Sequence, residues 1–388
     1  MSSEFEVVVY GASGYTGRLV AEYLHGEYGD GLRFAMAGRS LDKLADVRAQ
    51  IGLPDSVALI AADSGDPDSL AAMCARTDAV ITTVGPYQLY GEPLVEACVE
   101  SGTDYVDLSG EPAWMRDMIE RYDAKARETG ARIVHSCGFD SIPFDLGVFH
   151  LQQAAKAEHG APFARVRGRV RKMQGTFSGG TAASFMETMK RAGRQPEILE
   201  WLKDPFSLTP GFEGPAQPTG HKPILDEDLG SWAAPFIMAS INTKNVHRSN
   251  QLMDHVYGED FTYDEMVMTG PGERGQAAAE GLAKQDAFGK NPPKPGEGPS
   301  KEERENGFYE AAFYGGDGRM ASVVTGDKDP GYGSTSKMIA EAALCLTRDV
   351  GRDCTPGGVY TPAAAMGGAL IDRLVEHAGL TFEIETAA

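Results

Sequence analysis

Short apolar runs alternate with amphipathic segments along residues 1–136. The runs are rich in Val and Ile and apolar at successive positions, which is typical of parallel strands buried on both faces. The segments between them have readable helix ends, with Ser40 and Asp66 at starts and Gly102 and Gly130 at stops. This alternation predicts a doubly wound Rossmann sheet with right-handed crossovers. The expected strands are Phe5–Tyr10, Leu32–Ala37, Val57–Ala62, Ala79–Val84, Tyr105–Leu108 and Arg132–His135.

The pattern changes after Pro143, where a helix to about Glu158 leads into a second set of elements. Two long stretches rich in Pro and Gly, Asp204–Ala234 and Gly270–Asn306, interrupt this set. Loops of that length are lids or partly disordered segments, and we expect the second to be a mobile flap, with disorder as the open alternative. The expected elements are strands at Arg165–Lys172, Phe236–Thr243, Phe261–Met268, Gly307–Tyr314 and Arg319–Thr325, helices at Ser334–Arg348 and Ala363–Ala378, and a short last strand at Thr381–Ile384.

These patterns predict an α/β protein with more than one domain. Its 388 residues exceed what a single compact core usually serves. We expect a Rossmann domain over residues 1–145 and a second α+β domain with a mixed sheet and long loops over residues 146–330. Residues 331–388 are expected to form C-terminal helices that pack back on the Rossmann domain.

The charge of the chain restricts its partners. The formal net charge of −20 repels phosphate backbones, so we expect no nucleic-acid partner, and an anionic cofactor needs a local positive site. The five cysteines show no CxxC spacing and the eight histidines no metal-ligand spacing, so no metal is predicted. No secretory signal pattern and no apolar run of about 18 residues is present, which predicts a cytoplasmic protein without a transmembrane segment. Peripheral membrane contact and a homodimer stay open.

Three glycines at a spacing of three follow the first expected strand and open an amphipathic helix. Gly11 permits the tight turn, Gly14 lets the backbone approach a pyrophosphate, and Gly17 lets the helix pack on the strand. The helix N-terminus then offers free N–H groups and a positive dipole end to the phosphates. The candidate cofactor residues in this loop are Gly11, Ala12, Ser13, Gly14, Tyr15, Thr16 and Gly17.

The end of the second strand indicates which dinucleotide is bound. NAD enzymes place Asp or Glu there to accept a hydrogen bond from the ribose 2′-hydroxyl, whereas this chain has Arg39 and Ser40, with Lys43 one turn later. A guanidinium forks onto a phosphate, and the Ser40 hydroxyl can donate as well. We therefore predict NADP as the cofactor, with the alternative that Arg39 is a solvated surface residue.

Further candidates lie at the carboxyl ends of the later strands. Asp63 can meet the adenine edge or cap the next helix. Gly85 and Pro86 turn the chain at the edge where the nicotinamide half lies, and Tyr87 is our first candidate for the proton donor, with a wall residue as the equal alternative. The candidate cofactor residues at these strand ends are Asp63, Thr83, Val84, Gly85, Pro86, Tyr87 and Cys137.

The sixth strand end and the second domain offer weaker candidates. Cys137 can be a nucleophile, but without an identifiable base a small buried thiol is the better interpretation. Asp140 and Ser141 are expected to cap the helix that begins near Pro143. His247 and Arg248 are expected to end a strand, either at a solvated edge or facing the substrate.

The chain resembles the saccharopine dehydrogenase-like oxidoreductases, and within them the branch of trans-acting enoyl reductases of bacterial envelope-lipid synthesis. The resemblance implies an NADPH-dependent reductase with a mixed-sheet second domain and a lipid substrate, but not true saccharopine dehydrogenase activity. The motifs that carry it are Gly11–Gly17, Ala37-Gly38-Arg39, Val84-Gly85-Pro86-Tyr87, Cys137–Pro143, Ser178-Gly179-Gly180-Thr181, Asp329-Pro330-Gly331-Tyr332-Gly333 and Gly357–Pro362.

Three functions stay open on these grounds. The leading one is NADPH-dependent reduction of an activated C=C or C=O bond in an acyl or lipid-like substrate. A saccharopine-type amino-acid dehydrogenase would need cations for the substrate carboxylates. Within Asp204–Ser240, however, Lys222 is the only Lys or Arg. A non-catalytic NADP sensor or scaffold is the third, because no proton donor is certain from the sequence.

Overall fold

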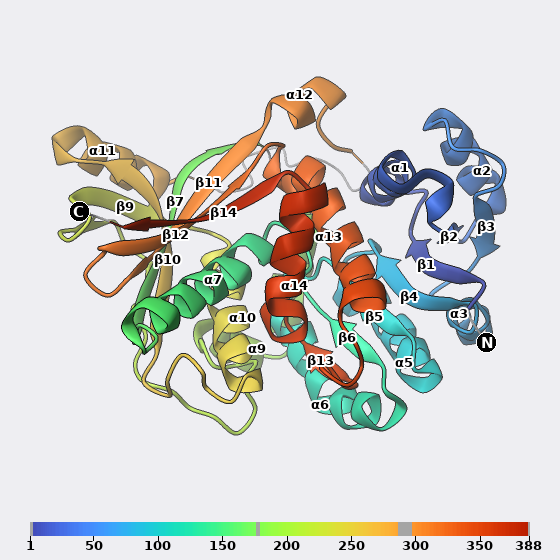
Figure 1. The fold of residues 1–388 in the computed structure, drawn as a ribbon, viewed down its shortest axis with the longest axis horizontal. Coiled ribbons are helices and arrows are strands. Elements are labelled where there is room, and N and C mark those ends of the chain that lie inside the picture. Colours follow the sequence, from blue (N-terminus) through green and yellow to red (C-terminus); the bar gives the residue numbers. More distant parts are fainter. Residues whose placement is uncertain (1–2, 176–178, 286–296, 387–388) are drawn as a thin grey trace.

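Two seven-stranded sheets lie side by side in the computed structural model, which describes residues 3–175, 179–285 and 297–386 (Figure 1). The first sheet is parallel throughout, in the order β3-β2-β1-β4-β5-β6-β13. The central strand β1 pairs Val8 with Ala35 on one side and with Val80 on the other. The predicted Rossmann fold is therefore confirmed. Its strands are β1 (Phe5–Tyr10), β2 (Phe34–Gly38), β3 (Ala58–Ala61), β4 (Thr77–Thr82), β5 (Asp104–Val106), β6 (Arg132–Val134) and β13 (Gly358–Tyr360).

Four helix ends of the Rossmann sheet lie where the sequence predicts. The Ser40 hydroxyl accepts from the backbone N–H of Lys43 at 3.3 Å. The Asp66 carboxylate accepts in the same way from the backbone N–H of Ser69, in the next helix. Gly102 and Gly130 end two helices with φ of 72° and 84°, in the left-handed region that favours glycine. The helices are α1 (Tyr15–Tyr28), α2 (Leu41–Gln50), α3 (Pro67–Cys74), α4 (Tyr87–Tyr90), α5 (Glu92–Ser101) and α6 (Pro112–Thr129), with a 3-10 turn η1 (Gly29–Gly31) after α1.

The C-terminal residues contribute to both sheets. The strand β13, which the sequence analysis missed, pairs with β6 through Val359 and Ile133 and extends the parallel sheet. Helix α13 (Thr335–Leu344) packs against α1, and α14 (Pro362–His377) packs against α7. The last strand, β14, pairs with β12 in the second sheet. The chain therefore crosses between the two sheets again after residue 330 (Figure 1).

The second sheet is mixed, as predicted, in the order β14-β12-β11-β7-β10-β9-β8. Strands β7 and β10 run parallel, and the other neighbours run antiparallel. Helix α7 packs on β11 and β12, and α10 packs on α7 and β10. The strands are β7 (Arg165–Gln174), β8 (Ile224–Asp226), β9 (Ser231–Pro235), β10 (Thr262–Gly270), β11 (Phe308–Gly315), β12 (Met320–Gly326) and β14 (Leu380–Thr386). The helices are α7 (Ile142–His159), α8 (Gly179–Ala192), α9 (Glu197–Lys203), α10 (Ala239–Leu252), α11 (Gly272–Leu282) and α12 (Lys301–Asn306), with π-helical turns η2 (Pro330–Ser334) and η3 (Cys345–Asp349).

The strand predicted at Phe236–Thr243 is wrong. The chain there leaves β9 and enters α10, which is buried along most of its length although it is largely polar. Its polar side chains are paired in the interior; for example, the Asn242 amide donates to Glu265 at 2.9 Å and the Asn245 amide donates to Ser141 at 2.9 Å. A buried helix of this composition has no apolar stripe at helical spacing, so its pattern did not reveal it.

The two long Pro/Gly stretches are more regular than expected. The first contains β8 and β9, and the described ends of Gly270–Asn306 form α11 and α12. The predicted mobile flap falls partly on residues 286–296, which lie outside the described residues. Beyond them, the backbone carbonyl of Glu297 accepts from the Tyr332 hydroxyl at 3.1 Å, and Tyr332 and Arg304 both contact Tyr15. The chain between residue 297 and α12 therefore runs beside the start of α1.

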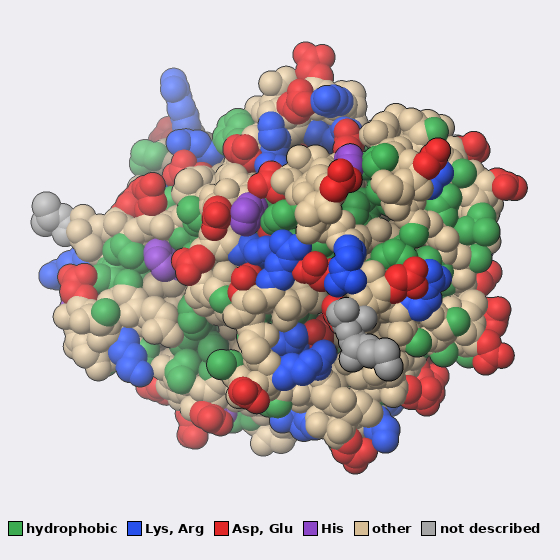
Figure 2. All heavy atoms as spheres, turned by 45° about the vertical axis from the view of Figure 1, so that its right-hand side comes forward, with side chains coloured by type: hydrophobic (Ala, Val, Ile, Leu, Met, Phe, Trp, Pro, Cys, Tyr) green, Lys and Arg blue, Asp and Glu red, His purple; other side chains and the backbone are tan. Residues whose placement is uncertain are grey.

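The described residues give no sign of a membrane span or a metal centre. No helix among them is long and apolar enough to cross a bilayer, and no group of three or more His, Cys, Asp or Glu is placed to hold a metal ion. All five cysteines are free. On the face drawn in Figure 2, acidic side chains are spread toward the rim and basic side chains gather near the middle.

Candidate functional site

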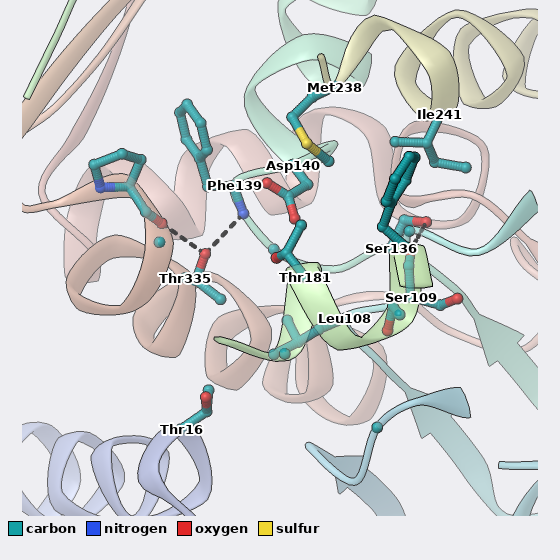
Figure 3. Close-up of a pocket in the computed structure, with 18 of the residues that line it drawn as sticks. Thr16, Leu108, Ser109, Ser136, Phe139, Asp140, Thr181, Met238, Ile241 and Thr335 are labelled. Carbon is teal, nitrogen blue, oxygen red and sulfur yellow. Dashed lines mark hydrogen bonds between the residues drawn. The ribbon is translucent and has the colours of Figure 1, made fainter. Parts of the chain in front are cut away.

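A cavity of about 370 Å³ opens at the carboxyl ends of β4, β5 and β6. This edge is where doubly wound sheets bind their ligands. Residues of α8, α10 and η2 close the cavity from the other side, so both halves of the molecule contribute to it (Figure 3). The sequence-predicted residues in its wall are Gly14, Tyr15, Thr16, Thr83, Gly85 and Tyr87.

The glycine-rich loop has the geometry of a phosphate cradle. Gly11 has a φ of 88°, and a Cβ there would lie 2.6 Å from the Val84 side chain. A Cβ on Gly17 would lie 2.3 Å from the carbonyl oxygen of Gly11, so helix and loop pack with no room for a side chain. Gly14 precedes α1 without a side-chain cap, which leaves the first helical N–H groups for a ligand. Ala12 is buried beneath the loop, whereas Ser13 is exposed.

The end of β2 presents positive charge beside this loop. Arg39 and Lys43 are exposed, and neither forms an ion pair with another described residue. Ser40 is half-buried and caps α2, which leaves its hydroxyl hydrogen available to an acceptor. This arrangement fits a 2′-phosphate, and it supplies the local positive site that an acidic chain needs for an anionic cofactor.

We predict that Arg39→Ala lowers the preference for NADPH over NADH by at least about tenfold, because charge-assisted bonds to a phosphate contribute that much. Calorimetric titration with both cofactors measures the preference. Arg33→Ala, which removes an exposed arginine at the other end of β2, is the matched control and should leave the ratio unchanged. An unchanged ratio in Arg39→Ala would mean that Arg39 is a solvated surface residue.

The remaining cofactor candidates follow strands β3 and β4. The Asp63 carboxylate accepts from the Gly65 N–H at 2.9 Å and does not cap α3, whose cap is Asp66. Thr83 lies against the carbonyl of Gly11 at 3.5 Å. Val84 and Pro86 are half-buried outside the cavity wall, next to the exposed Gly85.

Tyr87 lines the cavity but directs its hydroxyl into the protein. The hydroxyl donates to the Thr82 carbonyl at 3.2 Å and accepts from the Leu108 N–H at 3.0 Å, and the ring stacks on Trp114. Burial, with a contribution from the charge of Asp107, raises the pKa of this phenol well above its ordinary value. The geometry favours the wall residue of the two interpretations over the proton donor.

Cys137 does not reach the cavity wall. Its side chain is fully buried, with the thiol 3.6 Å from the Val134 carbonyl oxygen. Burial raises the pKa of the thiol well above its ordinary value, so the reactive thiolate is disfavoured. This position fits the buried-thiol interpretation.

The buried carboxylate of Asp107 connects the two loops that follow β5 and β6 and line the cavity. Asp107 accepts from the N–H groups of Ser109 and Ser136 at 2.9 Å each, and it contacts the His135 ring nitrogen at 2.7 Å. Ser136 has a φ of 63°, a left-handed conformation that is uncommon outside glycine. The loops after β5 and β6 are therefore fixed against each other by one side chain.

Asp140 is the residue that the sequence analysis misjudged. It lines the cavity, half-buried, and no other described residue forms a hydrogen bond or an ion pair with its carboxylate. Figure 3 shows its side chain directed into the cavity, with Met238 and Thr181 among the residues drawn around it. Burial raises the pKa of this carboxyl to about 6, so it exchanges a proton near neutral pH.

Neither Asp140 nor Ser141 caps α7 as predicted. The helix begins at Ile142 without a side-chain cap, and the Ser141 hydroxyl is instead bonded to Asn242 and Asn245 of α10. The packing of α10 against this corner uses the hydroxyl that would otherwise serve as the cap.

His247 and Arg248 are also placed differently than expected. Both lie on α10 and are only 3% exposed, rather than at a strand end. Burial lowers the pKa of His247 to about 3 and that of Arg248 to about 10. The Arg248 guanidinium donates to the carbonyls of Leu208 and Val359, which is a structural role.

Charged side chains are scarce in the cavity wall. Among its described residues, Asp140 is the only acidic one, and none is Lys, Arg or His. The part of the wall that α10 and its preceding turn supply is mostly apolar, with Ile237, Met238 and Ile241 beside Ser240. Such a wall suits an uncharged group, and its described residues offer no cation for a carboxylate.

The NADP-binding half of the chain matches a known family. Residues 7–134 match the saccharopine dehydrogenase NADP binding domain. NADP is therefore the cofactor, in agreement with the glycine loop and with Arg39.

Relatives and solved structures extend the likeness over the whole chain. A trans-acting enoyl reductase of Mycobacterium ulcerans is 37% identical over 96% of this chain and 96% of its own. A Mycobacterium tuberculosis protein, provisionally given the same name, is 41% identical over 96% of this chain and 95% of its own. The apo saccharopine dehydrogenase (L-Glu forming) of Saccharomyces cerevisiae has the same fold, with a TM-score of 0.53 and 12% identity. The match covers 99% of this chain and 100% of the dehydrogenase. Homospermidine synthase of Legionella pneumophila in complex with NAD also has this fold, with a TM-score of 0.54 and 10% identity. The match covers 100% of this chain and 92% of the synthase.

Proposed function

Because the chain belongs to the trans-acting enoyl reductases of the saccharopine dehydrogenase-like family, we propose that it reduces an activated C=C bond in an acyl or lipid-like substrate. It is an NADP-dependent oxidoreductase. The finer assignment, an acyl C=C bond, is supported by one observation above all. Among the described residues, the cavity beside the glycine loop has an apolar patch, formed by Ile237, Met238 and Ile241, and one carboxyl group, Asp140, with an elevated pKa.

Each part of the reaction has a residue suited to it. Bound NADPH supplies the hydride. The N-terminus of α1 and Arg39 bind the cofactor phosphates and fix its position against the cavity. Asp140 holds a proton on a carboxyl oxygen and donates it to the substrate carbon next to the acyl carbonyl, leaving a carboxylate. Ile237, Met238 and Ile241 keep water away from the reacting carbons.

The same wall argues against a saccharopine-type amino-acid dehydrogenase. An amino-acid substrate would bring carboxylates close to the reacting carbon, and fixed cations would have to neutralise them. The described wall of this cavity has none. The names of the relatives also favour C=C over C=O reduction.

A substrate panel tests the proposal. We expect NADPH oxidation with long-chain enoyl thioesters and none with saccharopine or its precursors under the same conditions. Matched keto-acyl thioesters separate C=O from C=C reduction. Turnover confined to the amino-acid panel would overturn the proposal, and silence on all substrates would favour a non-catalytic NADP sensor.

A further inference from the structure

A second cavity, of about 750 Å³, adjoins the first. It lies between β7 and β10 of the second sheet, α10, and the loop at residues 217–221. The two cavities have wall residues in common and therefore lie next to each other. The common wall residues are Met173, Leu202, Ile237 and Ser240.

A buried lysine forms part of the wall of the second cavity. Lys244, on α10, is 2% exposed and lines the cavity. Its Nζ donates to the Leu202 carbonyl at 3.0 Å, and it forms no ion pair with another described residue. Burial lowers the pKa of Lys244 to about 8, with the charge of Asp204 partly opposing this, so the group stays mostly protonated at pH 7.

The carboxylates of the same wall do not neutralise this cation. Glu265 accepts from the Tyr263 hydroxyl at 2.7 Å and from the Asn242 amide at 2.9 Å, and burial raises its pKa to about 8. It is therefore mostly uncharged at pH 7. The other acidic residue of the wall, Asp264, is paired with two arginines of β7.

A structural role explains only part of Lys244. The Leu202 carbonyl belongs to the last turn of α9, and lysine commonly bonds such unpaired carbonyls. That bond uses one of the three hydrogens on Nζ. A buried charge without an ion-pair partner is unfavourable in the empty protein, because the more distant charge of Asp204 only partly offsets the burial, and an anionic ligand would relieve it.

We propose that the second cavity binds an anionic oxygen group, a carboxylate or a phosphate, at the far end of the substrate, with Lys244 as the cation that receives it. This proposal rests on the proposed function and specifies its substrate as an anionic amphiphile. The reducible bond lies in the first cavity beside Asp140, and the chain passes Met173 and Ile237 to reach Lys244.

Three probes that cannot be reduced test the proposal by calorimetric titration of the NADP-loaded protein: decanoate, decyl phosphate and decan-1-ol. The wild type should bind at least one of the two anions about tenfold more tightly than the alcohol, because hydrogen bonds to charged groups contribute that much. The better-bound anion distinguishes a carboxylate from a phosphate terminus. Equal affinities for all three probes would overturn the proposal without any variant being needed.

Two matched variants assign the effect to one lysine. Lys244→Gln keeps a donor for the Leu202 carbonyl but removes the charge, and it should weaken anion binding about tenfold while leaving decan-1-ol binding unchanged. Lys203→Gln makes the same change at an exposed lysine of the same wall that is paired with Glu200, and it should have no effect. An anion affinity that falls only in Lys203→Gln, or in neither variant, contradicts the assignment.

Cofactor affinity and the unfolding temperature show whether Lys244→Gln is folded. If Lys244→Gln is unfolded, Lys244→Arg is tested in its place. This variant keeps the charge and should retain the preference for the anion. Loss of that preference in a folded Lys244→Arg variant counts against the site. Since none of the probes is reduced, failure of anion binding and absence of reductase activity are separate results.

Discussion

Replacing Asp140 with asparagine should lower the turnover number with an enoyl substrate by about 100-fold or more, because general acids contribute that much to proton transfer. The amide has the same shape as the carboxyl group but cannot donate a proton of comparable acidity. Since Asp140 forms no bond with the other described residues, the change should leave the cavity and the NADPH affinity unaltered. Steady-state kinetics and cofactor titration of the same preparation check both expectations.

The pH profile separates a proton donor from a structural residue. The protonated carboxyl is the active form, so the wild-type turnover number should fall as the pH rises above about 6, the pKa of Asp140. The Asp140→Asn variant should lack this decline. Asp68→Asn, the same change at an exposed carboxylate of α3, should retain it. A turnover number within twofold of wild type, or an unchanged profile, would remove Asp140 from the mechanism.

The elevated pKa also fixes the sign of the stability change. Burial raises the pKa of Asp140 from 3.8 to about 6, so the folded protein binds this proton more tightly than the unfolded chain. The free energy of unfolding therefore falls as the pH rises between these two values. At pH 8, Asp140→Asn should unfold at a higher temperature than the wild type, whereas at pH 3 the two should be close. A lower unfolding temperature at pH 8 would mean that the charged carboxylate has a stabilising partner.

Replacing Gly14 with valine should abolish NADPH binding, a loss of about 100-fold or more, while the chain remains folded. A Cβ at this position has a single close neighbour, the Gly11 carbonyl oxygen at 3.2 Å. The side chain would therefore extend into the exposed space before α1, where we expect the pyrophosphate to bind. Calorimetric titration gives the affinity, and thermal unfolding shows that the fold persists.

The choice of glycine makes this experiment interpretable. Gly26→Val introduces the same side chain in α1, at a position with no atom within 4 Å, and should leave NADPH affinity unchanged. Gly17→Val is unsuitable because its Cβ would clash with the loop backbone and disturb the fold itself. If folded Gly14→Val binds NADPH as the wild type does, the phosphates lie elsewhere.

The Rossmann half could be predicted from the sequence because its elements carry local signals. The strands around Val8 are apolar on both faces, and residues such as Ser40 and Gly102 mark helix ends by their own chemistry. The strand β13 was missed because three residues far along the chain give no periodic signal and pair only through the tertiary fold.

The second half was less predictable because its interior is polar. Helix α10 buries Asn242, Lys244 and Asn245 instead of an apolar stripe, so hydrophobic periodicity failed there. The long Pro/Gly segments hid β8 and β9, because among the described strands β8 pairs only with β9, and β9 joins the sheet through a long-range contact with β10.

The site shows the same division. The positions of the glycine loop and Arg39 could be predicted from motifs, because the local chain alone places these residues at the ends of β1 and β2. Asp140 and Tyr87 do not, because their roles depend on where a hydroxyl or carboxyl points after folding. The sequence places both at strand ends, but only the structure bonds the Tyr87 hydroxyl to the backbone and leaves the Asp140 carboxyl facing the cavity.

Transfer of deuterium from NADPH labelled at the nicotinamide C4 position tests the central proposal most directly. The enzyme is incubated with the labelled cofactor and a long-chain enoyl thioester, and the product is analysed by mass spectrometry. Reduction of the activated C=C bond predicts a saturated acyl product with one deuterium on the β-carbon and an unlabelled proton on the α-carbon. Deuterium on a carbinol carbon, or an enoyl thioester recovered without label while NADPH is consumed, would contradict the account.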